Sequence, residues 1–159
     1  MEPMWSVEQA RDDDAASALA VTQRAFARYR DKYAVPPDPL RETIDDVLAD
    51  IRRGDVWVAR DGERVVGVVR ARELEGAREV YEIYGLAVDP DYSQLDVGRS
   101  LVRVVEERLR GRGARAIQLR TGLRDAPAIE FWYRLDYRPF RLELDPEHGY
   151  DRVWFEKAL

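Results

Sequence analysis

The fold is decided by residues 82–90, which read Glu-Ile-Tyr-Gly-Leu-Ala-Val-Asp-Pro. They end a longer stretch, 79–88, whose Tyr, Ile and Val content predicts a strand. Gly85 inside that strand favours a bulge, although it could also make room for an aromatic ring packed above it. After Pro90 a loop runs to Gly98, and apolar residues then recur at the helical spacing of Leu101, Val105 and Leu109. We therefore expect a strand, a loop and an amphipathic helix in succession.

The N-terminal side of this unit predicts an antiparallel sheet with two helices. Strands are expected over 5–10, 55–60 and 63–74, and Asp61-Gly62 is a strong hairpin signal between the last two. The expected helices cover 12–30, capped by three aspartates at 12–14, and 40–53, stopped by Gly54. Their inward positions are predicted as Leu19, Thr22, Phe26 and Tyr29 in the first helix, and Ile44, Val47, Leu48 and Ile51 in the second.

The C-terminal side predicts a strand over 116–120, a helix over 125–135 and closing strands over 137–144 and 150–155. A strand-helix-strand crossover therefore follows an antiparallel first half. The fold class is α/β with a mixed, mostly antiparallel sheet of about seven strands and four helices. With 159 residues and no linker-like stretch, the chain is expected to form a single domain over 1–159.

Composition excludes several kinds of chemistry. The chain has no cysteine and one histidine, His148 in a turn, so thiol catalysis, thiolate metal sites and multi-histidine metal sites are not expected. No leader or membrane span is recognisable, which favours a cytoplasmic protein without a membrane partner. The net charge of −5 argues against nucleic-acid binding, although residues 99–124 carry eight arginines and leave that alternative open.

Three segments resemble the GNAT superfamily of acetyl-CoA-dependent N-acyltransferases: residues 82–90, Val97-Gly98 with the following helix, and 128–137, which is similar to the family's closing motif. The resemblance covers nearly the whole chain. It implies acetyl-CoA as acyl donor, a GNAT-like fold whose fourth and fifth strands are splayed, and pairing of the Leu86, Ala87 and Val88 backbone with pantetheine.

The loop that holds the coenzyme A pyrophosphate in this family is rich in glycine, which lets main-chain N–H groups approach phosphate oxygens. Here the corresponding residues are Ser93, Gln94, Leu95, Asp96, Val97 and Gly98, so only the last glycine remains and Asp96 adds a repelling charge. Arg99 in the first helical turn could offset that charge. The resemblance thus implies a degenerate pyrophosphate loop, and the lost glycines leave open a weakened activity. The alternative is a plain capped loop with Asp96 near a helix N-terminus.

Glu82 stands where several family members carry their general base, which the resemblance therefore implies for this residue. Alternation along the strand predicts Glu82, Tyr84, Leu86 and Val88 on one face, so that Glu82 would be a carboxylate on an otherwise apolar side. Such a group is either a catalytic base or the partner of an arginine on the neighbouring strand, Arg70 or Arg72.

The closing motif departs from the family's pattern. By alignment with it, Trp132 occupies the position of the tyrosine that protonates the leaving thiolate, and Asp125 that of an asparagine on the cofactor side. Tyr133 is the adjacent candidate acid, but it is turned by about 100° around the helix. Phe131, Trp132 and Leu135 can equally form a packing stripe.

The predicted function is direct transfer of an acetyl group to a primary amine of a small molecule or peptide in a ternary complex, since no cysteine can carry the acyl group. Tyr29, Tyr33 and the proline-rich residues 35–39 lie where similar proteins bind the acceptor, and those tyrosines suit a cation or are ordinary surface residues. The sequence leaves a homodimer open. The alternative is a non-catalytic GNAT-like domain that binds another ligand or a protein partner.

Overall fold

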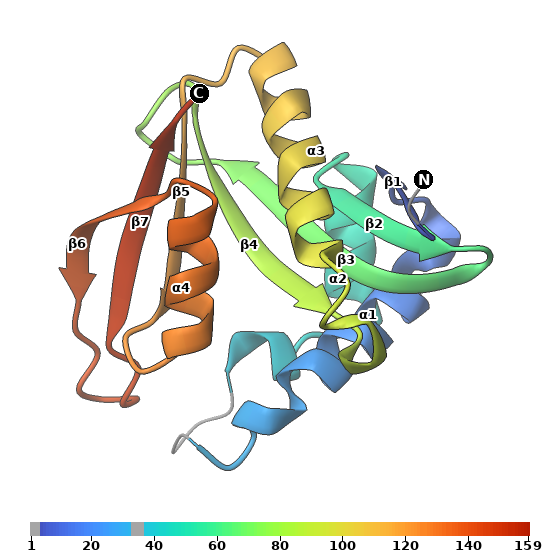
Figure 1. Cartoon of the computed structure of the whole chain (residues 1–159), viewed down its shortest axis with the longest axis horizontal. Helices are drawn as coiled ribbons and strands as arrows, with labels where there is room; N and C mark the ends of the chain where they lie inside the picture. The colour runs from blue at the N-terminus through green and yellow to red at the C-terminus, as the bar shows by residue number, and fades with distance from the viewer. Residues whose placement is uncertain (1–3, 33–36) are drawn as a thin grey trace.

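The computed structural model describes residues 4–32 and 37–159, which form a seven-stranded sheet in the order β1-β2-β3-β4-β5-β7-β6 (Figure 1). Every neighbouring pair is antiparallel except β4–β5, which is parallel. This confirms the predicted mixed α/β fold with four helices. The elements are β1 Ser6–Gln9, α1 Ala15–Phe26, α2 Ile44–Arg52, β2 Val56–Asp61, β3 Arg64–Glu73, β4 Val80–Val88, α3 Val97–Gly111, β5 Ala116–Gly122, α4 Ala126–Arg134, β6 Arg138–Glu143 and β7 Arg152–Ala158.

Two hydrophobic layers hold the helices against the sheet. Helices α3 and α4 cover one face, where Leu101, Ile117 and Phe155 belong to one buried cluster (Figure 1). Helices α1 and α2 cover the other face of β2–β4, with Leu19, Ile51 and Val58 in a second cluster. No helix in the described part of the chain has the length and apolar character needed to cross a membrane.

The first two helices start later than the sequence predicts. Residues 12–14 form a separate 3₁₀ turn, and Asp14 accepts two hydrogen bonds from Arg60 at 2.9 Å instead of capping α1 with its side chain. Helix α2 starts after Thr43, whose side chain and that of Asp46 cap each other's backbone N–H. The prediction that Ile44 faces inward is wrong, because it lies in the first turn of α2, before the buried positions begin at Val47, and is 48% exposed.

Gly85 forms the predicted bulge, with a positive φ of 63°. The register pairs Val68 with Ala87 but Arg70 with Tyr84, so two residues of β4 face Val69. The extra residue reverses the alternation of side chains along the strand. Our prediction that Leu86 and Val88 share a face with Glu82 is therefore wrong: both pack toward α3, whereas the Tyr84 hydroxyl reaches Asp50 of α2.

Strands β4 and β5 diverge beyond their first residues. They pair only from Val80–Ala116 to Glu82–Gln118, and their later parts separate (Figure 1). The predicted splay of the fourth and fifth strands is thus present. Glu82 lies on the last paired position, where the gap between the strands begins.

Candidate active site

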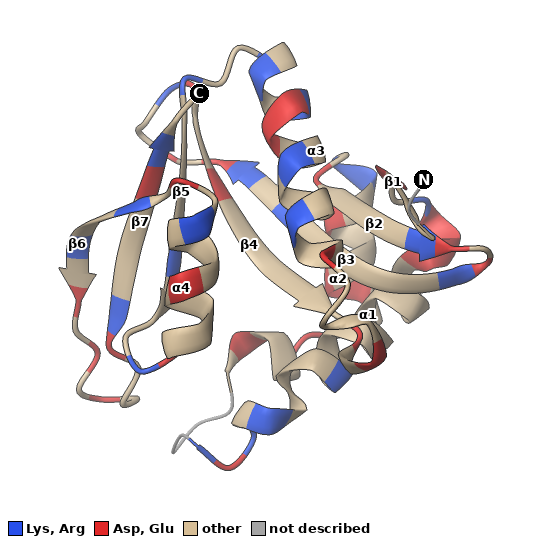
Figure 2. Cartoon of the chain, viewed as in Figure 1, with Lys and Arg blue, Asp and Glu red and all other residues tan. Residues whose placement is uncertain are grey.

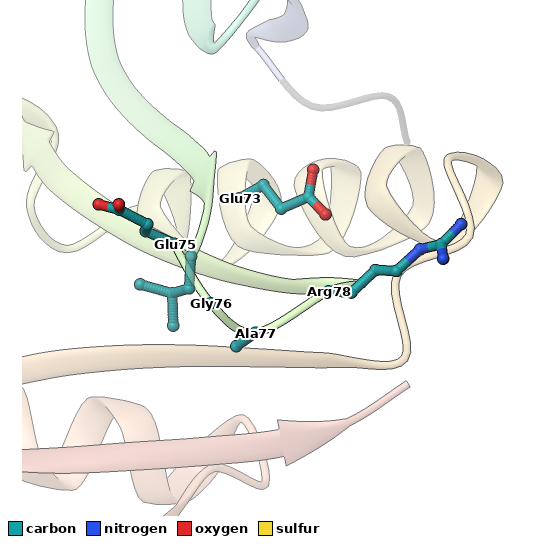
Figure 3. Close-up of a pocket in the computed structure, with 6 residues that line it drawn as sticks. Glu73, Glu75, Gly76, Ala77 and Arg78 are labelled. Carbon is teal, nitrogen blue, oxygen red and sulfur yellow. The ribbon is translucent and has the colours of Figure 1, made fainter.

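A cavity of about 1000 Å³ opens where β4 and β5 separate. Its walls come from the end of α1, from α2, from β3–β5, from residues 93–99 and from α4. A smaller hollow of about 550 Å³ lies at the β3–β4 turn (Figure 3). That hollow is built from residues 73–78 alone, and its Glu75 and Arg78 side chains point apart. Only the larger cavity gathers polar groups from several elements, so it is the candidate active site.

One end of the cavity lies at the N-terminus of α3. The first intrahelical bond runs from the Ser100 N–H to the Asp96 carbonyl oxygen, which leaves the N–H groups of Val97, Gly98 and Arg99 without intrahelical acceptors. A side chain at Gly98 would contact the Phe131 ring at 3.4 Å, so glycine lets α3 approach α4 closely. These N–H groups and the helix dipole favour an anion at this end of the cavity.

Asp96 adopts a left-handed backbone conformation with φ of 60°. This is a conformation that glycine adopts without cost and aspartate tolerates. Its side chain is exposed, lines the cavity and makes no hydrogen bond that caps α3. The loop therefore keeps the backbone shape of a glycine at this position and adds a negative charge beside the helix N-terminus.

The start of the loop is fixed by a buried carboxylate that sequence reasoning missed. Asp89 accepts hydrogen bonds from Arg24 at 2.7 Å, from Arg64 at 2.8 Å and from the Asp91 N–H at 3.0 Å. Burial alone would raise the pKa of Asp89, but the Asp91 N–H and the two guanidiniums hold it below its usual range. Asp89 thus ties the turn after β4 to α1 and β3.

Glu82 is 2% exposed and lines the cavity. Arg72, directly opposite on β3, donates to its Oε1 through Nε at 2.9 Å and Nη2 at 2.7 Å. The arginine partner considered in the sequence analysis is therefore Arg72 and not Arg70. The second oxygen, Oε2, lies 3.7 Å from Arg120 Nε and receives no hydrogen bond from the described residues. Glu82 thus has one oxygen fixed by two hydrogen bonds from Arg72, whereas the other has the longer ion pair with Arg120.

The wall formed by α2 contains a second buried charge network. Arg70 on β3 is 3% exposed and donates to Glu42 at 2.7 and 2.8 Å and to Asp50 at 3.1 Å. Burial lowers the pKa of Arg70, but Glu42 and the other nearby groups raise it overall, so the guanidinium stays charged. Tyr84 donates to Asp50, and burial together with this carboxylate raises the pKa of Tyr84 to about 12.

Helix α4 contributes Trp132 to the cavity, and Asp125 at its N-cap also lines it, but Tyr133 does not. Trp132 is buried, with its ring edge-on to Phe131 and Tyr137, so the predicted packing stripe is present. Tyr133 is 43% exposed and packs edge-on against Phe155, outside the cavity lining. This position does not favour the role of acid that the sequence analysis considered for Tyr133.

Asp125 links the N-terminus of α4 to the 3₁₀ turn Ala27–Tyr29 that follows α1. It caps α4 by accepting from the Ala128 N–H at 3.2 Å, and it also accepts a hydrogen bond from the Tyr29 hydroxyl. Burial and the Asp125 carboxylate raise the pKa of Tyr29 to about 12. The Tyr29 ring is already approached by Arg28 and Lys32, and Tyr33 lies outside the described residues.

The cavity brings together most of the residues that the sequence analysis singled out. Ala87 packs toward α1, and Leu95 is exposed, so neither side chain lines it. The arginines of 99–124 are interspersed with acidic residues along α3 (Figure 2), and among them Arg99 and Arg120 line the cavity. The predicted residues found in the lining are Glu82, Leu86, Val88, Ser93, Gln94, Asp96, Val97, Gly98, Arg99, Asp125 and Trp132.

Comparison with known proteins points to one family. Residues 19–137 match the acetyltransferase (GNAT) family. Mycothiol acetyltransferase of Cellulomonas flavigena is 30% identical over 81% of this chain and 38% of its own length. S-(2-succino)cysteine N-acetyltransferase of Bacillus subtilis is 27% identical over 96% of this chain and 86% of its own length. The chain spans less than half the length of the first curated relatives that it matches.

Solved structures share the fold at low identity. The crystal structure of PaiA N-acetyltransferase from Thermoplasma acidophilum, in complex with coenzyme A, superposes with a TM-score of 0.81 at 13% identity. The superposition covers the full length of both chains. At this identity the likeness concerns the fold alone.

Proposed function

The chain belongs to the GNAT family of acetyltransferases, and from this premise we propose that it transfers an acetyl group from acetyl-CoA directly to a primary amine. The observation that carries the proposal is Glu82. It is a buried carboxylate that lines the cavity at the point where β4 and β5 separate, and its Oε2 accepts no hydrogen bond from the described residues. An amine that is protonated at neutral pH must lose a proton before its lone pair can attack a carbonyl carbon, and a positioned carboxylate can accept that proton.

The proposed acetyl-CoA site is the part of the cavity that runs from the splayed strands to the N-terminus of α3. The free N–H groups at residues 97–99 and the Arg99 side chain suit the coenzyme A phosphates. The exposed backbone of β4 beyond the Gly85 bulge suits the amide groups of pantetheine, because β5 no longer pairs with it there. This part of the cavity therefore has Arg99 and backbone N–H groups for the phosphates at one end, and β4 backbone for pantetheine along its length.

In the proposed reaction, the amine nitrogen forms a bond to the acetyl carbon and the carbon–sulfur bond breaks. Glu82 takes the amine proton, directly or through one water molecule, and the sulfur leaves as the thiolate. The chain has no cysteine to hold the acetyl group, which supports direct transfer. Because Tyr133 lies outside the cavity lining, water protonates the thiolate in this proposal.

Acetyl-CoA is expected to stabilise the folded protein. At about 100 times its dissociation constant, a ligand that binds only the native state adds about 2.7 kcal/mol to the free energy of unfolding. Thermal melting with and without acetyl-CoA measures this effect, and release of free thiol with a panel of amines measures turnover. A melting temperature that acetyl-CoA leaves unchanged at millimolar concentration would contradict the proposal.

Asp96→Gly is expected to tighten acetyl-CoA binding about tenfold, because it removes a carboxylate that repels the phosphates. Asp96 already has the left-handed backbone that glycine would adopt, so charge and not backbone freedom should dominate. Asp96→Asn should therefore recover most of the gain. Calorimetric titration of the three proteins at low and moderate salt checks this. Equal affinities would show that the Asp96 carboxylate does not act on the phosphates.

A further inference from the structure

We infer that the acceptor carries a carboxylate close to its amine, as an α-amino acid does, and that Arg120 binds this carboxylate while Glu82 receives the amine. The inference rests on the proposed function and specifies its substrate class. It comes from Glu82 on β4 and the charged side chains connected to it on β3, β5, β6 and β7.

These side chains form one connected ion-pair cluster, which we call the Glu82 cluster. Arg72 contacts Glu82 at 2.7 Å, and Arg120 lies 3.7 Å from Glu82 and 3.3 Å from Glu143. Arg152 lies 3.5 Å from Glu143. Three guanidiniums thus face two carboxylates, and the cluster has a net charge of +1.

Directly beside Glu82, this local charge disfavours an acceptor that brings only a cation. A simple amine or polyamine would place an ammonium beside Glu82, between two guanidiniums that already neutralise it. An acceptor with its own carboxylate adds no net charge, and its anion meets the unbalanced guanidinium. The three arginines of the cluster all line the cavity, so an acceptor can reach them.

The spacing of the cluster matches the size of an α-amino acid. Glu82 Oε2 and Arg120 Nε are 3.7 Å apart. Standard bond lengths place an α-amino nitrogen roughly 3 Å from the oxygens of its own carboxylate. These distances allow the amine to hydrogen-bond to Oε2 while the carboxylate meets the Arg120 guanidinium.

Neighbouring side chains position the Arg120 guanidinium without occupying all of its N–H donors. Its guanidinium lies 5.4 Å from the centre of the Trp154 ring on the adjacent strand β7 and donates to Glu143 at 3.3 Å. Its side chain remains about one third exposed. Arginine has five N–H donors in a planar fork that suits a carboxylate, and the contacts named here occupy few of them. Arg72 is the poorer candidate because its Nε and Nη2 are both committed to Glu82.

The test compares acceptors that differ only in the carboxylate. Each α-amino acid of a panel is assayed beside its own α-carboxamide and the amine that lacks the group altogether, by release of free thiol from acetyl-CoA. The carboxylate form is expected to have a kcat/KM about ten- to a hundredfold higher, the range of one charge-assisted hydrogen bond. In Arg120→Gln this preference should fall to about unity, and Arg120→Lys should restore part of it.

Arg141→Gln is the matched control. Arg141 lies over the same Trp154 ring at 4.7 Å but outside the cavity lining, so its loss should leave the preference unchanged. Carboxamides or polyamines that react as well as the amino acids, or a preference that survives in Arg120→Gln, would overturn the inference and leave the acetyltransferase function intact. If acetyl-CoA binds but no member of the panel reacts, the inference fails as well. Failure of acetyl-CoA to bind would instead contradict the proposed function.

Discussion

Glu82→Gln is expected to lower kcat for acetyl transfer about a hundred- to ten-thousandfold, the usual contribution of a general base. The amide is close in shape to the carboxylate but cannot take up the amine proton. Acetyl-CoA affinity should change less than about threefold, because Glu82 is proposed to act on the acceptor and not on the donor. Thiol release under saturating substrates gives kcat, and titration calorimetry gives the affinity for acetyl-CoA.

The matched control for this variant is Glu143→Gln. Glu143 also pairs with Arg120, at 3.3 Å, but it does not line the cavity. Its replacement removes the same charge from the Glu82 cluster without touching the proposed base, so kcat should stay within about tenfold of the wild type, as for a neighbouring charge. A Glu82→Gln enzyme that turns over as fast as Glu143→Gln would assign Glu82 to structural ion pairing alone.

Local patterns in the sequence were sufficient to predict the elements of the fold. The hairpin that Asp61-Gly62 predicts joins β2 to β3, although Asp61 still pairs with Arg64 and the turn residues are Gly62 and Glu63. The apolar spacing from Leu101 to Leu109 marks the buried face of α3. Gly85 also indicated the bulge. The sequence pattern failed to predict the consequence of that bulge, which moves Leu86 and Val88 to the opposite face of β4 from the one that simple alternation assigns.

Within the site, the sequence located the loop and the strand residues, but it did not predict which distant residues form ion pairs with one another. The loop 93–99 could be located because it follows the strand that leads into the crossover helix, and Glu82 because the sequence resembles the GNAT family at that position. Asp89 with Arg24, and Asp50 with Arg70, join residues far apart in the sequence, 65 and 20 positions respectively. A single charged residue gives no local signal of which opposite charge it will meet, so register and helix packing decide these pairs.

Arg70→Met is expected to lower the free energy of unfolding by about 3 to 5 kcal/mol, because it leaves Glu42 and Asp50 without their buried cation. The guanidinium also fills the space beside the bulge: a side chain at Gly85 would lie 2.6 Å from Arg70 Nη2. Loss of Arg70 should therefore loosen β4 at the point where it leaves β5. Denaturant unfolding measures the stability, and thiol release at a temperature where the variant remains folded measures the effect on the site.

Arg134→Met is the matched control, because it removes an arginine from an exposed ion pair that solvent screens. Arg134 contacts Glu130 one turn away on the surface of α4 at 2.7 Å, and both side chains are more than 60% exposed. Its loss should cost less than about 1 kcal/mol. The difference between the two variants isolates burial as the cause, since each removes one arginine and adds one methionine. If Arg70→Met were as stable as Arg134→Met, then Glu42 and Asp50 would be satisfied without Arg70, and this network would not support the bulge.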